Sequence, residues 1–407
     1  MISRRWVIVA LLGAATTINY IDRQTLSILS PLLRRELHLS DHDYSNVVTA
    51  FLISYTVMYS LGGRIMDAIG VRVGLSVSLA WWSIATMLTG FAHSVTSLSL
   101  FRFLLGIGEP CVFPAGVKVC GEWFPDRLRA TATGIFSSGS ALGAILAPPV
   151  IAWITLKFGW RHAFLIPGIL GLIWLPVWWT VYRPMAGSQV RTQPTQWLDL
   201  LRSRTVWGLV LARLFSDPVW YFYLFWLPDY LQRERNLTLA QIALYGWIPF
   251  LFADLGNLGG GMLSDILVRR GLSPRHARLT VLIGVACLAP IGALAGVAPS
   301  TASAIAVTCL VAFLTQCWST NTAALVAEVM PGRETGSTMG LMGTAGSLAG
   351  AGFAQVLAYV IHTFGYPAAF ALGAILHPCA AVILVCMLRH HGAYFPKSLS
   401  PNLNGAS

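Results

Sequence analysis

Stretches of about 20 mostly apolar residues recur along the chain, and a helix of ~20 such residues crosses the ~30 Å hydrocarbon core of a bilayer. Short segments rich in charged residues, proline or glycine separate these stretches. The pattern predicts twelve transmembrane helices, at 6–29, 44–63, 73–92, 95–118, 130–155, 162–182, 205–231, 240–262, 278–297, 301–329, 334–361 and 364–388. The first stretch carries Asp22 and Arg23 and lacks a small-residue cleavage site, so we expect a retained helix there.

The longest polar gap separates six predicted helices from six. It runs from Arg183 to Arg204 and contains two prolines and a glycine, a composition typical of a linker. We therefore expect an all-α membrane protein with twelve transmembrane helices in two six-helix halves. The expected parts are an N-terminal bundle at 1–182, a cytoplasmic linker at 183–204, a C-terminal bundle at 205–388 and a cytoplasmic tail at 389–407.

Composition and charge support this interpretation. Only 11% of the residues are charged, against roughly a quarter in an ordinary soluble domain. Of the 27 Lys and Arg residues, 18 fall in gaps on the side of the N-terminus and six in gaps on the other side. Basic residues in short loops stay in the cytoplasm, which predicts a multi-pass protein of the plasma (inner) membrane with both termini cytoplasmic.

The same distribution limits the possible partners. The net charge of +11 follows from topology, so no nucleic-acid partner is expected. The seven cysteines lie in or beside apolar spans without CxxC spacing, so we expect small packing residues and neither a disulfide framework nor a metal site. The expected surroundings are the lipid bilayer, with the chain as a monomer.

A short motif occurs once in each half, at the turn between the second and third helices of that half. Its members are Gly62-Gly63, Asp67 and Arg72 in the first half, and Gly260-Gly261, Asp265 and Arg270 in the second, at identical spacing. Paired glycines let helices approach closely, and the carboxylate and arginine can bind a neighbouring helix terminus or each other. We expect the motif, through Gly63, Asp67, Arg72, Gly261 and Asp265, to gate the halves. A generic basic turn is the alternative.

Ionisable residues inside predicted spans are informative, because each costs at least ~2.5–3.5 kcal/mol at a helix centre unless it is paired or hydrated. They are Asp22 and Arg23 in the first helix, Arg102 and Glu109 in the fourth, Arg213 and Asp217 in the seventh, and Asp254 in the eighth. At ~1.5 Å rise per residue, Asp22 and Arg102 fall at similar depth. Glu109 follows Arg102 by two turns on one face.

The four charges of the first half suit anion and proton chemistry. Arg23 and Arg102 can offer planar forks to a substrate carboxylate. Asp22 and Glu109 can exchange protons when a substrate anion competes for those arginines, which would link anion binding to proton binding. A buried salt-bridge network that holds the helices in register is the structural alternative.

Polar and aromatic residues complete a possible sugar-binding pocket. They are Tyr20 and Tyr55 in the first half and Trp318, Ser319 and Asn321 in the tenth helix, although each alone is more often a packing residue. Asp217 opens a run with prolines at 218 and 228, which predicts a discontinuous seventh helix that lines a cavity. A kinked helix with an aromatic belt at the membrane interface is the alternative for the later residues of that run.

The motifs around these residues resemble the major facilitator superfamily and, within it, the anion:cation symporter family, closest to its hexuronate-transporter branch. The matching segments are 19–24, 62–74, 102–109, 121–125, 134–136, 144–148 and 217–231. The likeness covers nearly the whole chain, and the last segment points to the hexuronate branch. Ser138 and Ser140 depart from the pattern, since relatives often carry an amide there.

The resemblance implies a proton-coupled symporter that imports a small organic anion, a hexuronate or related sugar acid, by alternating access. It implies Asp22 and Glu109 as proton-coupling carboxylates and Arg23 and Arg102 as anion-binding groups, with Tyr20 and Tyr55 near the substrate. The partners are then the anion and protons. No cofactor is expected beyond the proton gradient.

Two other functions remain to be weighed. A proton-driven efflux antiporter would share the fold, but the fifth helix lacks the glycine-proline pattern of such transporters, and two cavity arginines repel cations. A membrane enzyme or sensor would need converging catalytic groups. The histidines lie mostly in loops and tails, and no HExxH, phosphate loop or nucleophile elbow occurs. We therefore expect no catalytic residues.

Overall fold

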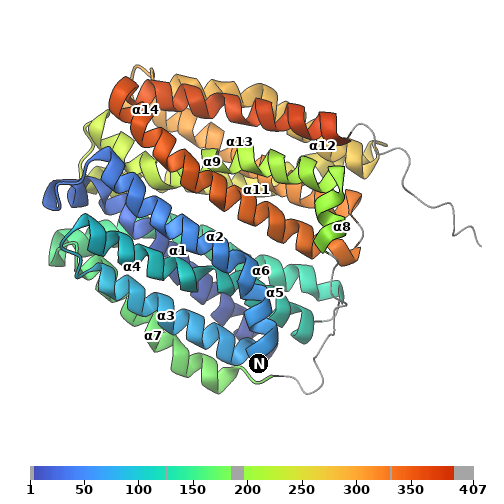
Figure 1. The fold of residues 1–407 in the computed structure, drawn as a ribbon, viewed down its shortest axis with the longest axis horizontal. Helices are drawn as coiled ribbons and strands as arrows, with labels where there is room; N and C mark the ends of the chain where they lie inside the picture. The colour runs from blue at the N-terminus through green and yellow to red at the C-terminus, as the bar shows by residue number, and fades with distance from the viewer. Residues whose placement is uncertain (1–3, 125, 185–196, 331, 389–407) are drawn as a thin grey trace, which may run out of the picture.

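The computed structural model describes residues 4–124, 126–184, 197–330 and 332–388, all of whose regular elements are helical (Figure 1). The α-helices of the N-terminal half are α1 (Arg4–Glu36), α2 (Asp41–Ile69), α3 (Val71–Thr89), α4 (Val95–Gly108), α5 (Val112–Trp123), α6 (Asp126–Phe158) and α7 (His162–Val181). A short α8 (Trp197–Arg202) precedes α9 (Arg204–Arg233), α10 (Leu239–Tyr245), α11 (Ile248–Arg269), α12 (Pro274–Leu288), α13 (Thr301–Val329) and α14 (Gly332–Leu388). The 3₁₀ segments are η1 (Glu109–Cys111) and η2 (Ala289–Ala295).

These elements form the twelve predicted spans. The fourth span consists of α4, η1 and α5, and the eighth consists of α10 and α11. The long α14 holds the last two spans, because Gly365 interrupts it with φ of 76°. Several helices run a few residues past the predicted limits, since an apolar count marks only the part inside the hydrocarbon. The predicted fold class is confirmed.

Eight helical segments of the described chain are long and apolar enough to cross a membrane. The helices α1 and α9 lie outside this set, and they carry Asp22, Arg23, Arg213 and Asp217. Polar side chains in these two helices reduce their apolar character, whereas the segment Val95–Trp123, which carries Arg102 and Glu109, remains within the set.

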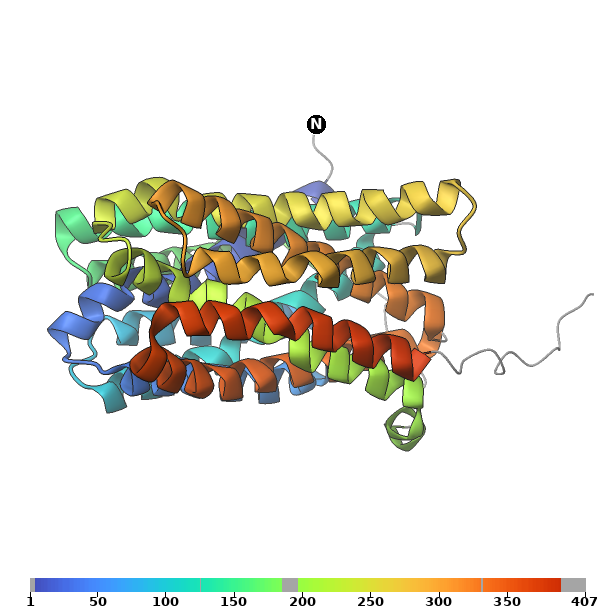
Figure 2. The ribbon, with the colours of Figure 1, turned by 90° about the horizontal axis from the view of Figure 1, so that it is seen from above.

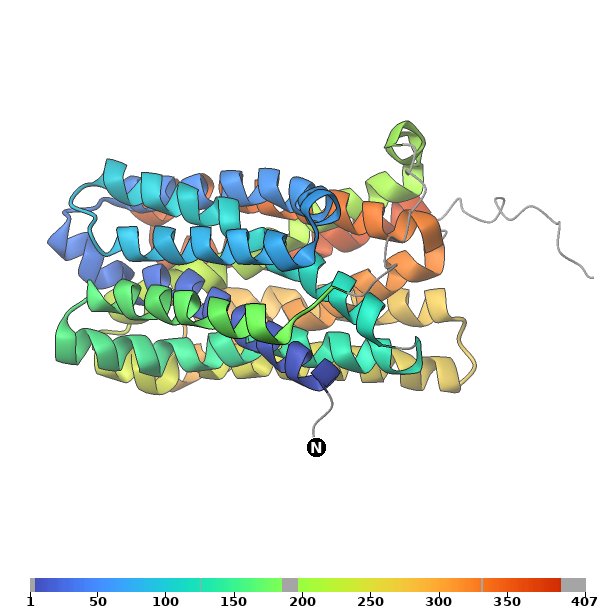
Figure 3. The ribbon, with the colours of Figure 1, turned by 90° about the horizontal axis from the view of Figure 1, so that it is seen from below.

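The two halves pack as two bundles with their helices running in a common direction (Figures 1, 2 and 3). Between the bundles α14 packs on α2 and α9 packs on α1. The end that holds the turn between α1 and α2, residues 37–40, is called the distal end below. The opposite end, which holds Arg4 and α8, is called the proximal end.

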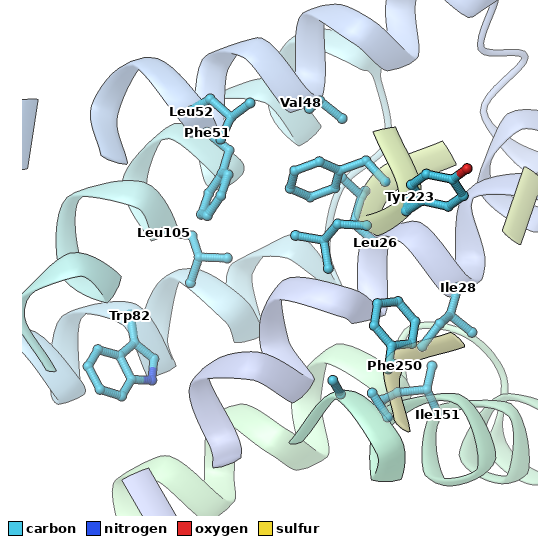
Figure 4. Packing of buried hydrophobic residues seen from close by; sticks show 14 of the residues in the cluster. Leu26, Ile28, Val48, Phe51, Leu52, Trp82, Leu105, Ile151, Tyr223 and Phe250 are labelled. Carbon is cyan, nitrogen blue, oxygen red and sulfur yellow. The ribbon is translucent and has the colours of Figure 1, made fainter. Parts of the chain in front are cut away.

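Apolar packing joins the bundles toward the distal end. One buried cluster contains Leu26 of α1, Val48 and Phe51 of α2, and Tyr223 of α9 (Figure 4). Hydrogen bonds reinforce it: the Tyr44 hydroxyl donates to the Phe225 carbonyl at 2.7 Å, and the Ser27 hydroxyl donates to the Leu224 carbonyl at 2.7 Å. The halves are therefore closed against each other at the distal end.

Arginines cap the last helix of each half at the proximal end. Arg4 donates two hydrogen bonds to the Val181 carbonyl at 2.9 and 2.7 Å, and Arg72 donates to the Trp179 carbonyl at 2.6 Å. Cations at a helix C-terminus donate hydrogen bonds to its free carbonyls and are attracted to the negative end of its dipole. The second half repeats the arrangement, with Arg204 on the Cys386 carbonyl and Arg275 on the Leu388 carbonyl. The repetition supports a duplicated unit, and the expected contact of Arg72 with a helix terminus is confirmed.

Two of the repeated glycines, Gly62 and Gly260, lie where helices approach each other closely. A Cβ on Gly62 would lie 3.1 Å from Cys111 Sγ, and a Cβ on Gly260 would lie 2.6 Å from Cys317 Sγ. Two of the seven cysteines therefore serve packing, as expected. A Cβ on Gly261 would make only an ordinary contact, 3.7 Å from the Thr320 side chain, and the expected gating role of that glycine stays a prediction.

The carboxylate of the second motif pairs with a different arginine from the one expected. Asp265 bonds Arg278 of α12 at 3.0 Å, and Arg278 also donates to the Ser264 hydroxyl. Gly63 and Asp67 belong to α2, and the contacts of both lie outside the described part of the structure. The linker residues 185–196 and the tail residues 389–407 also lie outside them.

The seventh span does not have the predicted discontinuity. One helix, α9, continues through Pro218 and Pro228. Its aromatic run does not form an interfacial belt either, because Phe222 and Trp226 are buried. Packing against α14, where Phe222 lies 5.0 Å from the Phe370 ring, holds the helix together despite the prolines.

Candidate functional site

An ion pair between α1 and the end of α4 forms the centre of the first half. Arg23 donates Nε–H and Nη2–H to the same oxygen of Glu109, Oε2, at 3.0 and 2.8 Å. The two side chains are 7% and 0% exposed. The Arg23 guanidinium also lies 4.9 Å from the Tyr20 ring centroid and 4.7 Å from that of Tyr55. These four predicted site residues are therefore in contact.

A local break in the fourth span places Glu109. Regular α-helix ends at Gly108, and Glu109 begins the 3₁₀ segment with Pro110 at its second position. Proline lacks an N–H and clashes with the preceding turn, which favours such a break. Asn19 approaches both partners, donating to the Glu109 carbonyl and accepting from Arg23, each at 3.5 Å. Neither Asn19 nor Pro110 was predicted to be a site residue, although the four-residue spacing of Asn19 and Arg23 and the Glu-Pro pair are visible in the sequence.

Arg102 takes a position that the sequence analysis did not foresee. It is fully buried, and its two terminal nitrogens donate to the main-chain carbonyls of Asp22 and Arg23 at 3.3 and 3.4 Å. Phe51 lies beneath its guanidinium at 5.0 Å. In this conformation Arg102 therefore holds α1 against α4 and is not accessible to a ligand.

Asp22 belongs to no ion pair within the described residues. Its side chain is fully buried beside the Thr86 hydroxyl of α3, and Arg102 interacts with it electrostatically. A buried carboxylate is very costly as an anion unless it is paired. The two carboxylates of the first half thus have different surroundings, because only Glu109 forms an ion pair there.

The second half contributes another ion pair. Arg213 Nε lies 2.8 Å from Asp217 Oδ2, one turn along α9, and Arg213 Nη1 donates to the Ser319 hydroxyl of α13 at 3.0 Å. Asp217 packs so closely on Gly346 of α14 that a Cβ there would collide with its carboxylate. Asp217 and Ser319 were predicted to be site residues. Their shared partner Arg213 was noted only as an intramembrane charge.

Two predicted residues of α13 lie elsewhere. Trp318 belongs to a cluster made only of second-half residues and packs edge-on against His377. Asn321 is fully buried and donates to the carbonyls of Gly260 and Cys317 at 3.0 and 2.9 Å. Successive residues of a helix differ by about 100° in direction, so only Ser319 of this group faces the charged pair. The expectation that Trp318 and Asn321 line the site is wrong in this conformation.

A third charged group joins the halves at the distal end. Arg34 lies 3.1 Å from Asp229 Oδ1 and donates to Asp41 at 2.7 Å. Arg233 lies 2.6 Å from Asp41 and 3.3 Å from Asp229. The Tyr366 hydroxyl of α14 also donates to Asp229. We call Arg34, Asp41, Asp229 and Arg233 the distal network. The distal network was not predicted, because its members lie at or near helix ends, where charged residues are common.

The described residues thus form two bundles with buried charge at their contact, an arrangement typical of membrane transporters that move their halves against each other. A family model described as Major Facilitator Superfamily matches residues 12–354. The chain therefore belongs to the major facilitator superfamily, and it is a transporter and not an enzyme.

Individual relatives agree with this assignment. The chain is 30% identical to the hexuronate transporter of Escherichia coli (strain K12) over 96% of its own length and 95% of the relative's. It is 29% identical to the galacturonate transporter of Dickeya chrysanthemi over 73% of its own length and 90% of the relative's. Among solved structures, a bacterial homologue of the human lysosomal transporter Spinster shares the fold, with a TM-score of 0.74, 20% identity and coverage of 95% and 96%.

Proposed function

We propose that the protein is a proton-coupled symporter that imports a hexuronate or related sugar acid by alternating access. The names of the two sugar-acid relatives support the substrate class. The observation that carries the coupling is the ion pair of Arg23 with Glu109, in which both donors of the guanidinium edge occupy one carboxylate oxygen. A substrate carboxylate fits the same edge.

Competition for Arg23 then links the two ligands. A substrate anion that takes the Arg23 edge leaves Glu109 buried without its cation. The neutral acid is the stable form of an isolated buried carboxylate, so Glu109 takes up a proton as the substrate binds. Asp22, which forms no ion pair among the described residues, is the group to which we assign the second exchangeable proton. Proton loading and anion loading thereby favour each other.

The surrounding residues have roles in this scheme. Tyr20 and Tyr55 flank the guanidinium and supply ring faces and hydroxyls to the sugar. Arg102 positions Asp22 and Arg23 through their carbonyls, and it reaches an anion only when α1 and α4 rearrange. Arg72 and Asp265 secure helix ends at the turns that we assign to gating, together with Gly63, Asp67 and Gly261.

The proposed orientation assigns a side to the closed end. Basic gaps place the termini in the cytoplasm, so the distal end faces outward and the structure is closed to the outside. The energy for uptake comes from the proton gradient, and the scheme needs no cofactor. The site lies within the plasma (inner) membrane. Both halves belong to a single chain. We propose that the monomer is the transporting unit.

The test is Glu109→Gln in reconstituted vesicles with radiolabelled galacturonate or glucuronate. The amide mimics the protonated acid, so we expect retained binding and loss of the uptake driven by an imposed pH gradient. Glu36→Gln, at the exposed end of α1, is the matched control and keeps that uptake. A Glu109→Gln protein that still accumulates substrate when the pH gradient is applied, and stops when a protonophore is added, would contradict the proposal.

A further inference from the structure

The ion pair of Arg213 and Asp217 lies on the side of α9 that faces the first half. Tyr59 of α2 interacts electrostatically with both residues. The side chains are 23% and 16% exposed, whereas those of Arg23 and Glu109 are 7% and 0% exposed. Of the two intramembrane pairs, the one in the second half is therefore more accessible to a ligand.

A row of tyrosines connects the two pairs. The Tyr55 ring lies 4.7 Å from the Arg23 guanidinium and 5.8 Å from the Tyr59 ring. Tyr59 in turn packs against Gly343 of α14, where an added Cβ would lie 2.5 Å from its ring. Tyrosines combine an apolar ring with a hydrogen-bonding tip, as a sugar requires. Aromatic side chains with hydrogen-bonding tips thus extend from Arg23 to α14 of the second half.

The two ends of this row differ in charge. Once Glu109 is protonated, the Arg23 end carries a net positive charge. The Arg213 end stays neutral overall, because Asp217 lies 2.8 Å from Arg213. A neutral pair of donor and acceptor suits hydroxyl groups, each of which both donates and accepts a hydrogen bond. It does not suit a second carboxylate, which Asp217 repels and which would have to displace Asp217 from Arg213.

We propose that Arg213 and Asp217, with Ser319, bind the hydroxyl-bearing end of a sugar acid and exclude a second carboxylate at that end. The inference rests on the proposed function and narrows it to sugar acids with one carboxylate. Ser319 orients Arg213 through the 3.0 Å hydrogen bond. Asp217 is the residue that determines the specificity, because its charge cancels that of Arg213.

The test compares the binding of galacturonate and of galactarate, its dicarboxylate counterpart, to purified protein in lipid nanodiscs. The wild type should bind galacturonate at least about tenfold more tightly, since a like charge at a binding site costs several kcal/mol. Asp217→Asn removes the repulsion and frees Arg213, so galactarate binding should strengthen about tenfold while galacturonate binding weakens. Glu234→Gln, an exposed carboxylate that directly follows α9, is the control and should keep the wild-type preference.

Each outcome decides a separate point. Galacturonate binding with the same preference in Asp217→Asn as in the wild type overturns the inference and leaves the proposed function intact. A wild type that binds neither acid overturns the proposed substrate class, and the inference with it. If Asp217→Asn cannot be recovered folded, Ser319→Ala is tested in its place. This variant should bind galacturonate several-fold more weakly, and its affinity for galactarate should not rise. Unchanged galacturonate binding refutes the inference.

Discussion

The distal network makes a specific prediction about the equilibrium between the closed and open distal end. Each half contributes one cation and one anion: Arg34 and Asp41 from the first, Asp229 and Arg233 from the second. When the halves separate, each cation keeps an anion of its own half, since Arg34 bonds Asp41 and Arg233 bonds Asp229. Only the contacts of Arg34 with Asp229 and of Arg233 with Asp41 are lost. The network can therefore hold the end closed and still open without leaving unpaired charge.

Asp229→Asn tests this reasoning. Removing one partner of a buried ion pair usually costs ~3–5 kcal/mol, because the other charge is left alone. In the closed state Arg34 and Arg233 both retain Asp41, so the loss approaches that of a hydrogen bond to a charged group, ~1.5–3 kcal/mol. In the open state Arg233 loses the same partner, but there it lies at a hydrated helix end, where an exposed ion pair contributes only ~0–1 kcal/mol. The closed state should therefore lose population relative to the open state, by a few-fold to about a hundredfold.

A distance measured across the distal end reports this change in the ratio of closed to open protein. The rings of His42 on α2 and His362 on α14 lie 6.3 Å apart on opposite halves. Spin labels at these two positions, in a background without the seven native cysteines, report the closed state as a short distance. Asp229→Asn should move the distribution toward long distances. Glu234→Gln, an exposed carboxylate five residues further on, should leave it unchanged. An unaltered distribution in Asp229→Asn would show that apolar packing alone keeps the end closed.

Two further predictions concern stability. Gly106→Ala should lower the midpoint of thermal unfolding, because the new methyl group collides with Ser54 and the Phe51 carbonyl, and such overpacking costs ~1–3 kcal/mol. Gly134→Ala should leave the midpoint unchanged, because the space around Gly134 is open. Arg72→Ala should cost ~1 kcal/mol through loss of the bond to the Trp179 carbonyl, whereas Arg270→Ala at the exposed end of α11 should cost less. Equal midpoints within either pair of variants would contradict the contact in question.

The same contacts show why the candidate site tolerates so much buried charge. Arg23 is satisfied by Glu109, Arg102 by main-chain carbonyls, and Arg213 by Asp217 and Ser319. Asp22 forms no such ion pair within the described part of the chain, and we propose that a proton neutralises it. A transporter needs such alternatives, because a cation that is satisfied equally well by a carboxylate and by a substrate can exchange one for the other at little cost.

The sequence by itself determined the spans, their number and the division into halves. A helix must satisfy its own backbone in lipid, so length and apolarity are enough to predict that it crosses the membrane. The sequence also indicated which residues are unusual, since charge inside a span is costly wherever it lies. The fold class and the intramembrane charges of α1, α4 and α9 were accessible on these grounds.

Only the tertiary structure decided which groups meet. Arg23 and Arg102 look equivalent in sequence, yet one binds Glu109 and the other binds the backbone of α1. The proline-containing α9 remains continuous because α14 supports it, and Trp318 and Asn321 turn away from Ser319. Such outcomes depend on the rotation and crossing of helices that are distant in sequence. Residue spacing fixes a side chain's direction only relative to its own helix, and packing between helices fixes the rest.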